Sequence, residues 1–511
     1  MIALVRSRAL APLERIVDAL ADPRRSHRTA GGLLVLYALL WWAYALIAKS
    51  TQDIHFDMGE VFSWSTELAY GYPKHPPFPA WVAALWFTIF PRADWAYYLL
   101  SAVSISLALW FAWLIAARLV DGDRRAVALV LLAFAPTFNF QPLKFNSNAL
   151  LITVWAGATW LFLRSYAERT FMAGALAGAA AAVAMLTKYW SAFLILGFVA
   201  AALAHPRRRD YFRSPAPWAS IVVGALLLAP NIANLVGYDF AAFKYAAASH
   251  ADTSFGPVLA SIGNYLTGVL YLAGPAAVLA LAASPGLAVW RDTAWPHEPD
   301  RRLLAVIMWT GLLAPIPVAL ALEVRLNALW TMHCWAVLPA LFLSAHGLAV
   351  TRRAAAAALA AAYAVPLVAL AASPVVAVNV LHRGVDSGAA YYSLLAHEVD
   401  RRWPQVSDKP LRYVAGPEQL AWACTFYCRD RPRAFPSFSR TNAPWIDPAA
   451  MAREGFAALC PATEPLCLRF ARELAAGNPN LREDTVDVAR QGWGTQGEPQ
   501  RFTIVLSPPR M

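Results

Sequence analysis

The stretch DIHFDMGEVFSWSTELAYGYPKHPPF, residues 53–78, directly follows the first long apolar segment of the chain. It places two Asp, two Glu, two His and one Lys between aromatic residues, whereas the surrounding sequence is mostly apolar. Binding and catalytic residues often lie on loops held by a rigid scaffold, so such a cluster of ionisable residues at a membrane surface suggests chemistry. We therefore expect this stretch to carry the chemistry and the apolar segments to hold it against lipid.

The composition predicts a polytopic membrane protein. Of its 511 residues, 59% are hydrophobic and 15% are charged, and the mean hydropathy is +0.44. These values are too apolar for an ordinary soluble enzyme. The net charge is +11, but the basic residues form short clusters between apolar segments instead of one continuous stripe. That pattern argues against a nucleic-acid partner.

Eleven apolar segments are expected to span the membrane. They cover residues 31–48, 97–117, 126–141, 148–163, 171–186, 191–204, 218–235, 262–283, 303–322, 331–350 and 354–373. With the N-terminus inside, every second loop carries the arginine excess that the positive-inside rule requires. These loops lie within 118–125, 164–169, 207–213, 291–302 and 352–353. The membrane domain is thus assigned to residues 30–373.

The alternation holds only if residues 78–90 do not cross the membrane. Thirteen residues are too short for a span of about 30 Å, so we expect a helix lying in the outer interface. The first external loop then covers residues 49–96. Residues 1–29 are arginine-rich, and Leu13, Ile16, Val17 and Leu20 recur at helical spacing, which predicts a cytoplasmic amphipathic helix.

After residue 373 the chain becomes polar, and residues 374–511 are predicted to form a small external α/β domain. Residues 411–415 and 502–506 read as strands, and 418–426 and 448–454 read as helices. Two close cysteine pairs suit disulfides, although their spacing does not fix the connectivity and zinc is a weaker alternative. The pairs are Cys424 with Cys428 and Cys460 with Cys467.

The chain contains neither a P-loop nor a dinucleotide-binding glycine motif after a strand. ATP-driven transport therefore has no support. An enzyme working outside the cytoplasm has no nucleoside triphosphate at hand, so an activated donor must reach it through lipid. Asp57 and Glu60 suit general bases, and Lys74 and His75 suit neutralisation of a phosphate leaving group. The structural alternative for each carboxylate is a helix cap or a salt bridge.

Lysine is rare, and five of the six lysines lie in or beside successive external loops. These five are Lys49, Lys74, Lys144, Lys188 and Lys244. One interpretation is that arginine is simply preferred and that a few lysines extend toward the interface at helix ends. The other is a shared basic site for an anionic group presented from the outer leaflet.

Five motifs together resemble glycosyltransferase family 39, the bacterial relatives of protein O-mannosyltransferases. The family includes aminoarabinose and galacturonic acid transferases that modify lipid A. The motifs are DMGE (57–60), FSWSTELAYGYPKHPPFPAW (62–81), LKFNSNALL (143–151), LTKYW (186–190) and NALWTMHCW (327–335). They occur in order through most of the membrane region.

The resemblance implies a GT-C fold: a multispan helical domain, a polyprenyl-phosphate sugar donor and a C-terminal periplasmic domain. It places the protein in a bacterial inner membrane, with the active site outside. By position, Asp57 would activate the acceptor hydroxyl and Lys74 would contact the lipid-linked phosphate. The acceptor would be lipid A, another envelope glycolipid or a protein.

The sequence departs from the family pattern in the second external loop. Many members carry an Asp there, whereas this chain has Asn146 and Asn148. An amide can bind a sugar or position a carboxylate, but it is neither a base nor a strong metal ligand. Asp57 would therefore act alone, with Glu60 as reserve, and neither a metal nor another cofactor is expected.

The predicted substrate-binding set is completed by residues from the other external loops: Lys144, Asn146, Asn148, Lys188 and Lys244. Two alternatives to a transferase remain open at this level. A transporter or flippase of a lipid-linked substrate would use a similar basic cavity, although no repeated broken-helix pattern is evident. A non-catalytic family member is the second alternative, because the loop Asp is missing.

Overall fold

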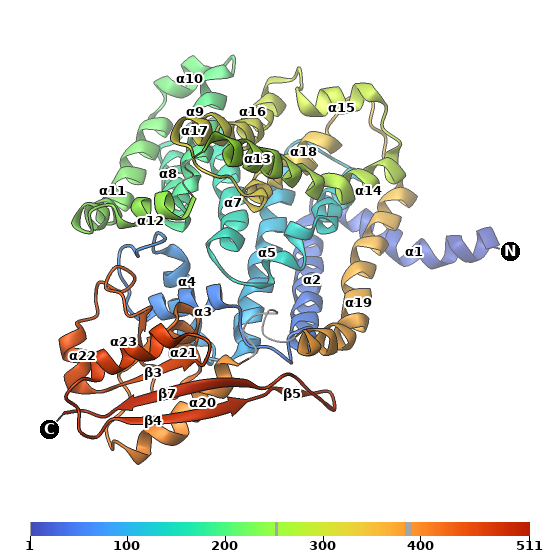
Figure 1. Cartoon of the computed structure of the whole chain (residues 1–511). Coiled ribbons are helices and arrows are strands. Elements are labelled where there is room, and N and C mark those ends of the chain that lie inside the picture. Colours follow the sequence, from blue (N-terminus) through green and yellow to red (C-terminus); the bar gives the residue numbers. More distant parts are fainter. Residues whose placement is uncertain (1, 251–253, 384–390, 511) are drawn as a thin grey trace.

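The computed structural model describes residues 2–250, 254–383 and 391–510. A helical body carries a small sheet domain at one end (Figure 1). The helices of the body are α1 (Ile2–Ala21), α2 (Ser26–Ala48), α3 (Phe56–Ser65), α4 (Phe78–Ile89), α5 (Asp94–Ala116), α6 (Arg124–Val130), α7 (Ser147–Glu168), α8 (Phe171–Thr187), α9 (Ala192–Ala204), α10 (Arg208–Arg213), α11 (Pro215–Gly237), α12 (Ala241–His250), α13 (Phe255–Leu266), α14 (Ala273–Ala283), α15 (Leu287–Ala294), α16 (Pro299–Leu313), α17 (Pro315–Leu322), α18 (Leu338–Leu343) and α19 (Arg352–His382).

Among the described residues, seven helical segments are long and apolar enough to cross a membrane. An eighth is a pair, 124–134 and 136–143, bent by 101°. The bend follows from Pro136, because a residue before proline avoids the helical conformation, and Ala135 is extended with ψ 131°. These eight match eight of the eleven expected segments. The other three fall on shorter apolar helices at 171–187, 189–204 and 328–343.

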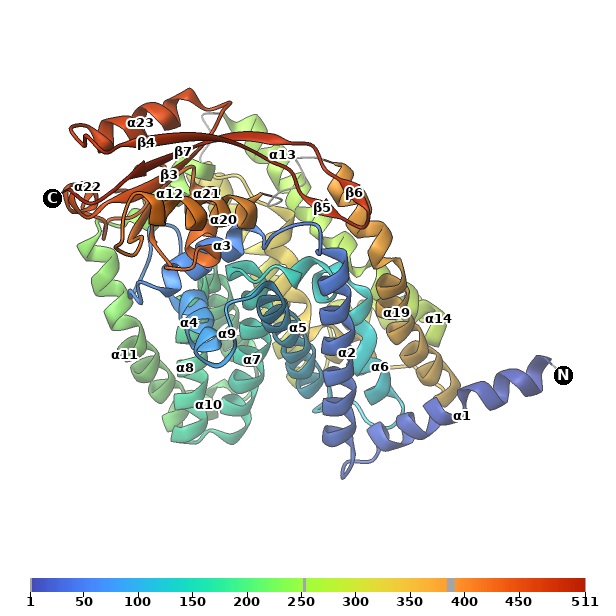
Figure 2. The same cartoon turned by 90° about the horizontal axis from the view of Figure 1, so that it is seen from below.

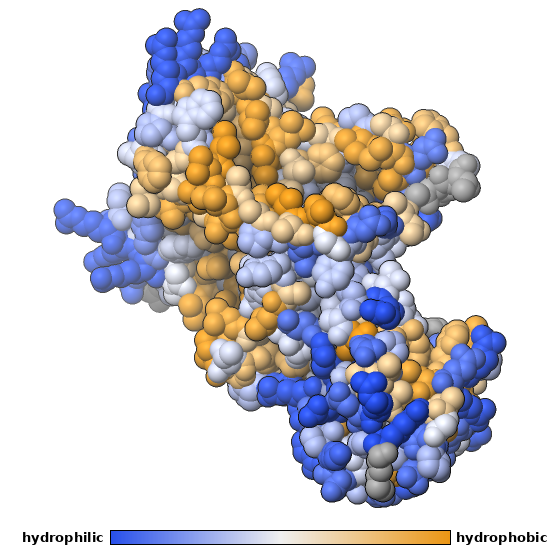
Figure 3. Space-filling model, turned by 90° about the vertical axis from the view of Figure 1, so that its left-hand side faces the viewer, coloured by the Kyte–Doolittle hydropathy of each residue, from blue (hydrophilic) through white to orange (hydrophobic). Residues whose placement is uncertain are grey.

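The multi-pass helical architecture is therefore confirmed. Apolar side chains gather over the helical body, whereas hydrophilic ones cover most of the C-terminal domain (Figure 3). On α11, Ile221, Val222 and Leu226 are more than half exposed, as expected of side chains that face lipid. The last span, α19, continues past the expected end at residue 373 to His382.

The helices α8 and α11 pack closely because α8 presents glycines at their contact. A Cβ on Gly174 would lie 2.1 Å from the carbonyl oxygen of Ala216, and one on Gly178 would lie 2.2 Å from that of Ser220. Small residues at such spacing let membrane helices approach each other. This pair supports the short α8, which lies beside one of the predicted site motifs.

The N-terminal helix α1 packs against the body. Val17 and Leu20, both on its predicted apolar face, are fully buried. In the first external loop, α4 has twelve residues and remains below the length of a span, in agreement with the expected interfacial helix.

The C-terminal domain contains a five-stranded mixed sheet of order β2-β1-β3-β7-β4. Its strands are β1 (Tyr413–Gly416), β2 (Arg433–Pro436), β3 (Phe456–Pro461), β4 (Arg482–Val488) and β7 (Gln500–Ser507), with a small ribbon of β5 (Gln491–Gly492) and β6 (Thr495–Gln496). Its helices are α20 (Tyr392–Arg402), α21 (Glu418–Tyr427), α22 (Pro448–Glu454) and α23 (Pro465–Ala475). β1 pairs in parallel with β2 and β3, whereas β7 is antiparallel to β3 and β4.

Seen from below, α20 and α21 lie between the sheet and α3, and α23 covers the opposite face (Figure 2). All four cysteines of the domain are bonded, Cys424 to Cys428 and Cys460 to Cys467. Within the described residues, the remaining cysteine, Cys334, is buried and unbonded.

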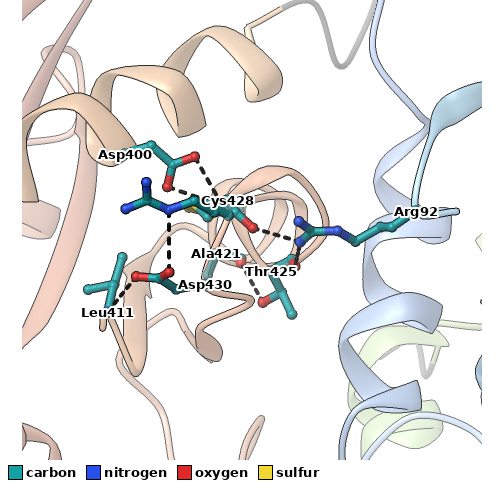
Figure 4. The surroundings of a disulfide bond; sticks show 9 residues. Arg92, Asp400, Leu411, Ala421, Thr425, Cys428 and Asp430 are labelled. Carbon is teal, nitrogen blue, oxygen red and sulfur yellow. Dashed lines mark hydrogen bonds and ion pairs between the residues drawn. A yellow bond between two sulfur atoms is a disulfide. The ribbon is translucent and has the colours of Figure 1, made fainter. Parts of the chain in front are cut away.

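Polar contacts fix the C-terminal domain to the first external loop. Arg92 donates to the carbonyl oxygens of Thr425 (3.1 Å) and Cys428 (2.6 Å), at the end of α21 beside a disulfide (Figure 4). Glu67 accepts two hydrogen bonds from Arg433, at 2.9 and 2.7 Å. Such bidentate pairs are geometrically specific. The two regions are therefore held in a defined orientation.

A second set of contacts lies at the start of the loop. Asp53 is buried and accepts hydrogen bonds from the Ser393 hydroxyl (2.6 Å) and backbone amide (3.1 Å), and it also pairs with Arg490. Between these anchors, Gly59 allows α3 to approach α21, because a Cβ there would lie 3.3 Å from the backbone nitrogen of Ala423. The C-terminal domain thus directly covers the helix that carries the predicted catalytic residues.

Candidate active site

Helix α3 carries both predicted catalytic carboxylates. Asp57 and Glu60 are one turn apart and project from neighbouring positions on the helix. The helix begins after His55, whose Nδ1 accepts a hydrogen bond from the Asp57 backbone amide at 3.2 Å. Burial lowers the pKa of His55 to about 4, so the cap is a neutral imidazole at neutral pH. His55 therefore helps to fix the position of Asp57.

The Asp57 carboxylate lies among donors and cations. Its Oδ2 accepts a hydrogen bond of 2.7 Å from the Asn146 amide and lies 3.8 Å from Lys144 Nζ. The side chain is 25% exposed, so a substrate hydroxyl has access to it. A partly exposed, hydrogen-bonded carboxylate is suited to accept a proton from a bound group.

Asn146 contacts two elements through the two ends of its amide. Its Oδ1 accepts from the backbone amide of Ala149 at 2.9 Å and caps α7, while its Nδ2 donates to Asp57. The cap fixes which end of the amide faces the carboxylate. Asn146 is therefore placed to orient Asp57, which is one of the two roles expected from the sequence.

Two further predicted residues meet on the other side of α7. Lys188 Nζ donates to Asn148 Oδ1 at 2.6 Å and lies 4.9 Å from the centroid of the Trp330 ring. Trp330 belongs to the motif at 327–335, so the contact joins three of the motifs found in the sequence. Asn148 holds Lys188 and does not contact Asp57 through any hydrogen bond found among the described residues.

Glu60 and Lys74 form an ion pair of 2.9 Å in which both side chains are largely buried, at 7% and 15% exposure. Lys74 Nζ is also 3.3 Å from Glu418 Oε2 and lies over the Trp422 ring at 4.5 Å. Burial raises the pKa of Glu60 to about 7, with Lys74 opposing this shift. Burial alone would lower the pKa of Lys74, but Glu60 and Glu418 raise it above its usual value.

The sequence did not indicate that Glu418 and Trp422 belong to this cluster. Both come from α21 of the C-terminal domain, more than three hundred positions after Lys74. Asn442 extends the cluster by donating to Glu418 Oε1 at 2.7 Å. The available signal was only the expected helix at 418–426, since no local pattern shows which distant side chains a lysine contacts.

The other predicted residues are placed less centrally. His75 lies beside Lys74, and burial lowers its pKa to about 3, so at neutral pH it offers a phosphate a neutral donor and no charge. Lys49 lies near Lys144, and burial followed by repulsion from Lys144 lowers its pKa to about 8. Lys244 is exposed on α12 and pairs with Asp239. The structure therefore brings four of the five lysines around α3 and leaves Lys244 at the edge.

Lys244 instead lines a cavity of about 470 Å³ between the two domains. Gly71, Tyr72 and Pro73 of the first external loop form one wall. The remaining lining comes from the end of α11, from α12 and from residues 440–444. Tyr245, on α12, also faces Lys74 Nζ at 5.2 Å, so the cavity ends near Lys74.

Across the described ranges, His, Cys, Asp and Glu side chains form no group of three or more that could hold a metal ion.

Comparison with known proteins agrees with the resemblance seen in the motifs. The family described as dolichyl-phosphate-mannose-protein mannosyltransferase matches residues 74–233. No curated protein matches the chain.

The solved structures include two of ArnT from Cupriavidus metallidurans that are similar over 93% of this chain and 97% of that chain. The one bound to undecaprenyl phosphate has a TM-score of 0.56 at 17% identity, and the apo state has 0.58 at 14%. The likeness shows a shared fold, so the expected GT-C architecture is confirmed.

Proposed function

We propose that the protein is an integral membrane glycosyltransferase that moves a sugar from a polyprenyl-phosphate donor to an acceptor in the cell envelope. One observation carries the proposal: α3 presents an oriented carboxylate, Asp57, one turn away from the buried pair of Glu60 and Lys74. Inverting transfer needs a base on one side of the anomeric carbon and a phosphate-binding cation on the other. The family match and the ArnT-like fold support the same reaction class.

In this reaction Asp57 accepts the proton of the acceptor hydroxyl. The hydroxyl oxygen attacks the anomeric carbon, and the bond from that carbon to the phosphate oxygen breaks. The electron pair of the broken bond passes to the phosphate, whose added charge Lys74 stabilises. His75 donates one hydrogen bond as a neutral imidazole. Asn146 keeps Asp57 aligned throughout.

The cavity near Lys74 offers space for the lipid part of the donor. Its lining combines tyrosines and aliphatic groups with Lys244 and Arg440, which suits an amphiphile with an anionic head. The neighbouring ArnT structure was solved with undecaprenyl phosphate, which supports this donor class. We assign Lys144, Asn148 and Lys188 to contacts with the sugar or phosphate on the Asp57 side.

The proposed orientation puts the site and the C-terminal domain in the periplasm of a bacterial inner membrane. Two observations support it: the alternating arginine loops and the two disulfides of the C-terminal domain, since disulfides persist in oxidising compartments. The acceptor is proposed to be lipid A, another envelope glycolipid or a protein.

The test is sugar transfer in proteoliposomes supplied with lipid-linked sugars and envelope acceptors. Asp57→Asn is expected to abolish transfer while leaving thermal unfolding unchanged. Asp408→Asn, on an exposed turn of the C-terminal domain, is the matched control and is expected to retain activity. Full transfer by Asp57→Asn would overturn the assignment of the base. Movement of the lipid-linked sugar across the bilayer without transfer would overturn the proposed function.

A further inference from the structure

Glu418 is the more exposed of the two carboxylates that contact Lys74. It is the first residue of α21, and its side chain is 31% exposed, whereas that of Glu60 is 7% exposed. Its Oε2 contacts Lys74 Nζ at 3.3 Å, and its Oε1 accepts from Asn442 at 2.7 Å. Glu418 thus approaches Lys74 from the C-terminal domain, whereas Glu60 approaches it from α3.

The cluster has one more negative charge than a phosphate site needs. Lys74 carries a single positive charge and three donor hydrogens, and two carboxylates and an aromatic ring already surround it. A phosphate that binds Lys74 is repelled by each carboxylate that keeps both its charge and its contact with the lysine, because like charges at short range repel. Glu60 is enclosed by the packing of α3, so Glu418 is the group with room to move.

We propose that Glu418 is a stand-in for the donor phosphate: it occupies Lys74 in the substrate-free protein and is displaced when the phosphate binds. The proposal rests on the proposed function, in which Lys74 binds the lipid-linked phosphate. Asn442 both holds Glu418 and lines the cavity between the domains, so the displaced carboxylate lies beside the space that the donor fills.

This arrangement discriminates between donor and product. The donor is a phosphodiester with one negative charge, whereas the released polyprenyl phosphate is a monoester with a charge of about −1.5 to −2. Repulsion by Glu418 grows with the charge of the ligand. Glu418 therefore disfavours the product more than the donor, and its return to Lys74 promotes product release.

The experiment measures binding of a short prenyl phosphate and of its methyl phosphodiester to the full-length protein in nanodiscs. Glu418→Gln keeps the shape of the side chain and its acceptor for Asn442 but removes the charge. It is expected to tighten monophosphate binding roughly tenfold and diester binding roughly threefold, because the free energy of repulsion by Glu418 is proportional to the charge of the ligand. Glu473→Gln, an exposed site on α23, is the control and should change neither.

The outcomes distinguish a failure of the stand-in role of Glu418 from a failure of the phosphate site at Lys74. If Lys74→Gln loses binding but Glu418→Gln gains none, or gains equally for both ligands, the stand-in role is wrong and the phosphate site stands. Weaker binding by Glu418→Gln would show instead that this carboxylate holds Lys74 in place for the ligand. If Lys74→Gln binds like the wild type, both the phosphate site and the stand-in role fail.

Discussion

The substitution Asn146→Asp isolates the contact that orients Asp57. Aspartate caps a helix as well as asparagine does, so the start of α7 should be retained. The Nδ2 donor at 2.7 Å from Asp57 Oδ2 is replaced by a carboxylate oxygen. The variant therefore tests the orienting role separately from the capping role.

The size of the expected loss of activity follows from the distance between Asn146 Nδ2 and Asp57 Oδ2. Two ionised carboxylates at 2.7 Å repel by about 6 kcal/mol at an effective dielectric constant of about 20. Protonating one carboxyl group costs about 4 kcal/mol at pH 7 and about 7 kcal/mol at pH 9. Asp57 and the carboxyl group introduced at position 146 are thus expected to share one proton near neutral pH and to lose it in alkali. Loss of the charge-assisted hydrogen bond then costs about 1.5–3 kcal/mol.

The assay is the pH dependence of sugar transfer, expressed as the ratio of variant to wild type. The ratio should fall as pH rises, reaching a loss of roughly 10- to 150-fold near pH 9. Asn146→Ser keeps a cap but removes the donor, so its loss should not depend on pH. Asn480→Asp, at an exposed asparagine of the C-terminal domain, is the control for the change from amide to carboxylate and should show no such slope. A flat, wild-type ratio for Asn146→Asp, or a new requirement for a divalent ion, would refute the orienting role.

Three other predictions concern the cluster and the fold. Lys74→Gln should raise the KM for the lipid-linked donor far more than Lys409→Gln, which changes an exposed lysine, and equal effects would contradict the phosphate site. Burial raises the pKa of Glu60 to about 7, so this carboxyl group is mostly neutral at pH 6 and ionised at pH 8. A prenyl phosphodiester should therefore bind more weakly at pH 8 than at pH 6. In the same binding titration, Glu60→Gln should remove this difference. Gly174→Ala should destabilise the protein by about 1–3 kcal/mol in thermal unfolding, because its Cβ would meet a backbone carbonyl of α11, whereas Gly32→Ala, with open space around it, should not.

Much of the fold could be predicted from the sequence because lipid imposes strict rules. Length and hydropathy located the eight segments that are long enough to cross a membrane, and they identified the twelve-residue α4 as too short to do so. The expected strands and helices at 411–415, 418–426, 448–454 and 502–506 correspond to β1, α21, α22 and β7. The sharp bend at Pro136 was not expected, since a hydropathy pattern does not record direction.

The candidate site was predictable only in part. Motif order pointed to Asp57, Lys74 and Asn146, and the structure gathers them around α3. Tertiary contacts decided what each one does: the helix cap fixes the orientation of the Asn146 amide, and a second carboxylate from another domain occupies Lys74. The contact of Asn146 with Asp57 and that of Lys74 with Glu418 have no local signature, because the partners lie 89 and 344 positions apart in the chain.

The long separation of Lys74 and Glu418 has a consequence for biogenesis. Synthesis runs from the N-terminus, and domains generally fold in that order, so the spans are inserted before α21 exists as a folded helix. Until the last quarter of the chain has folded and Arg92 has bound it, the loop at 49–96 has no cover and Lys74 has only half of its partners. Folding of the C-terminal domain is therefore the step that completes the site, and a chain that stops after α19 would hold its spans but lack half of the contacts of Lys74.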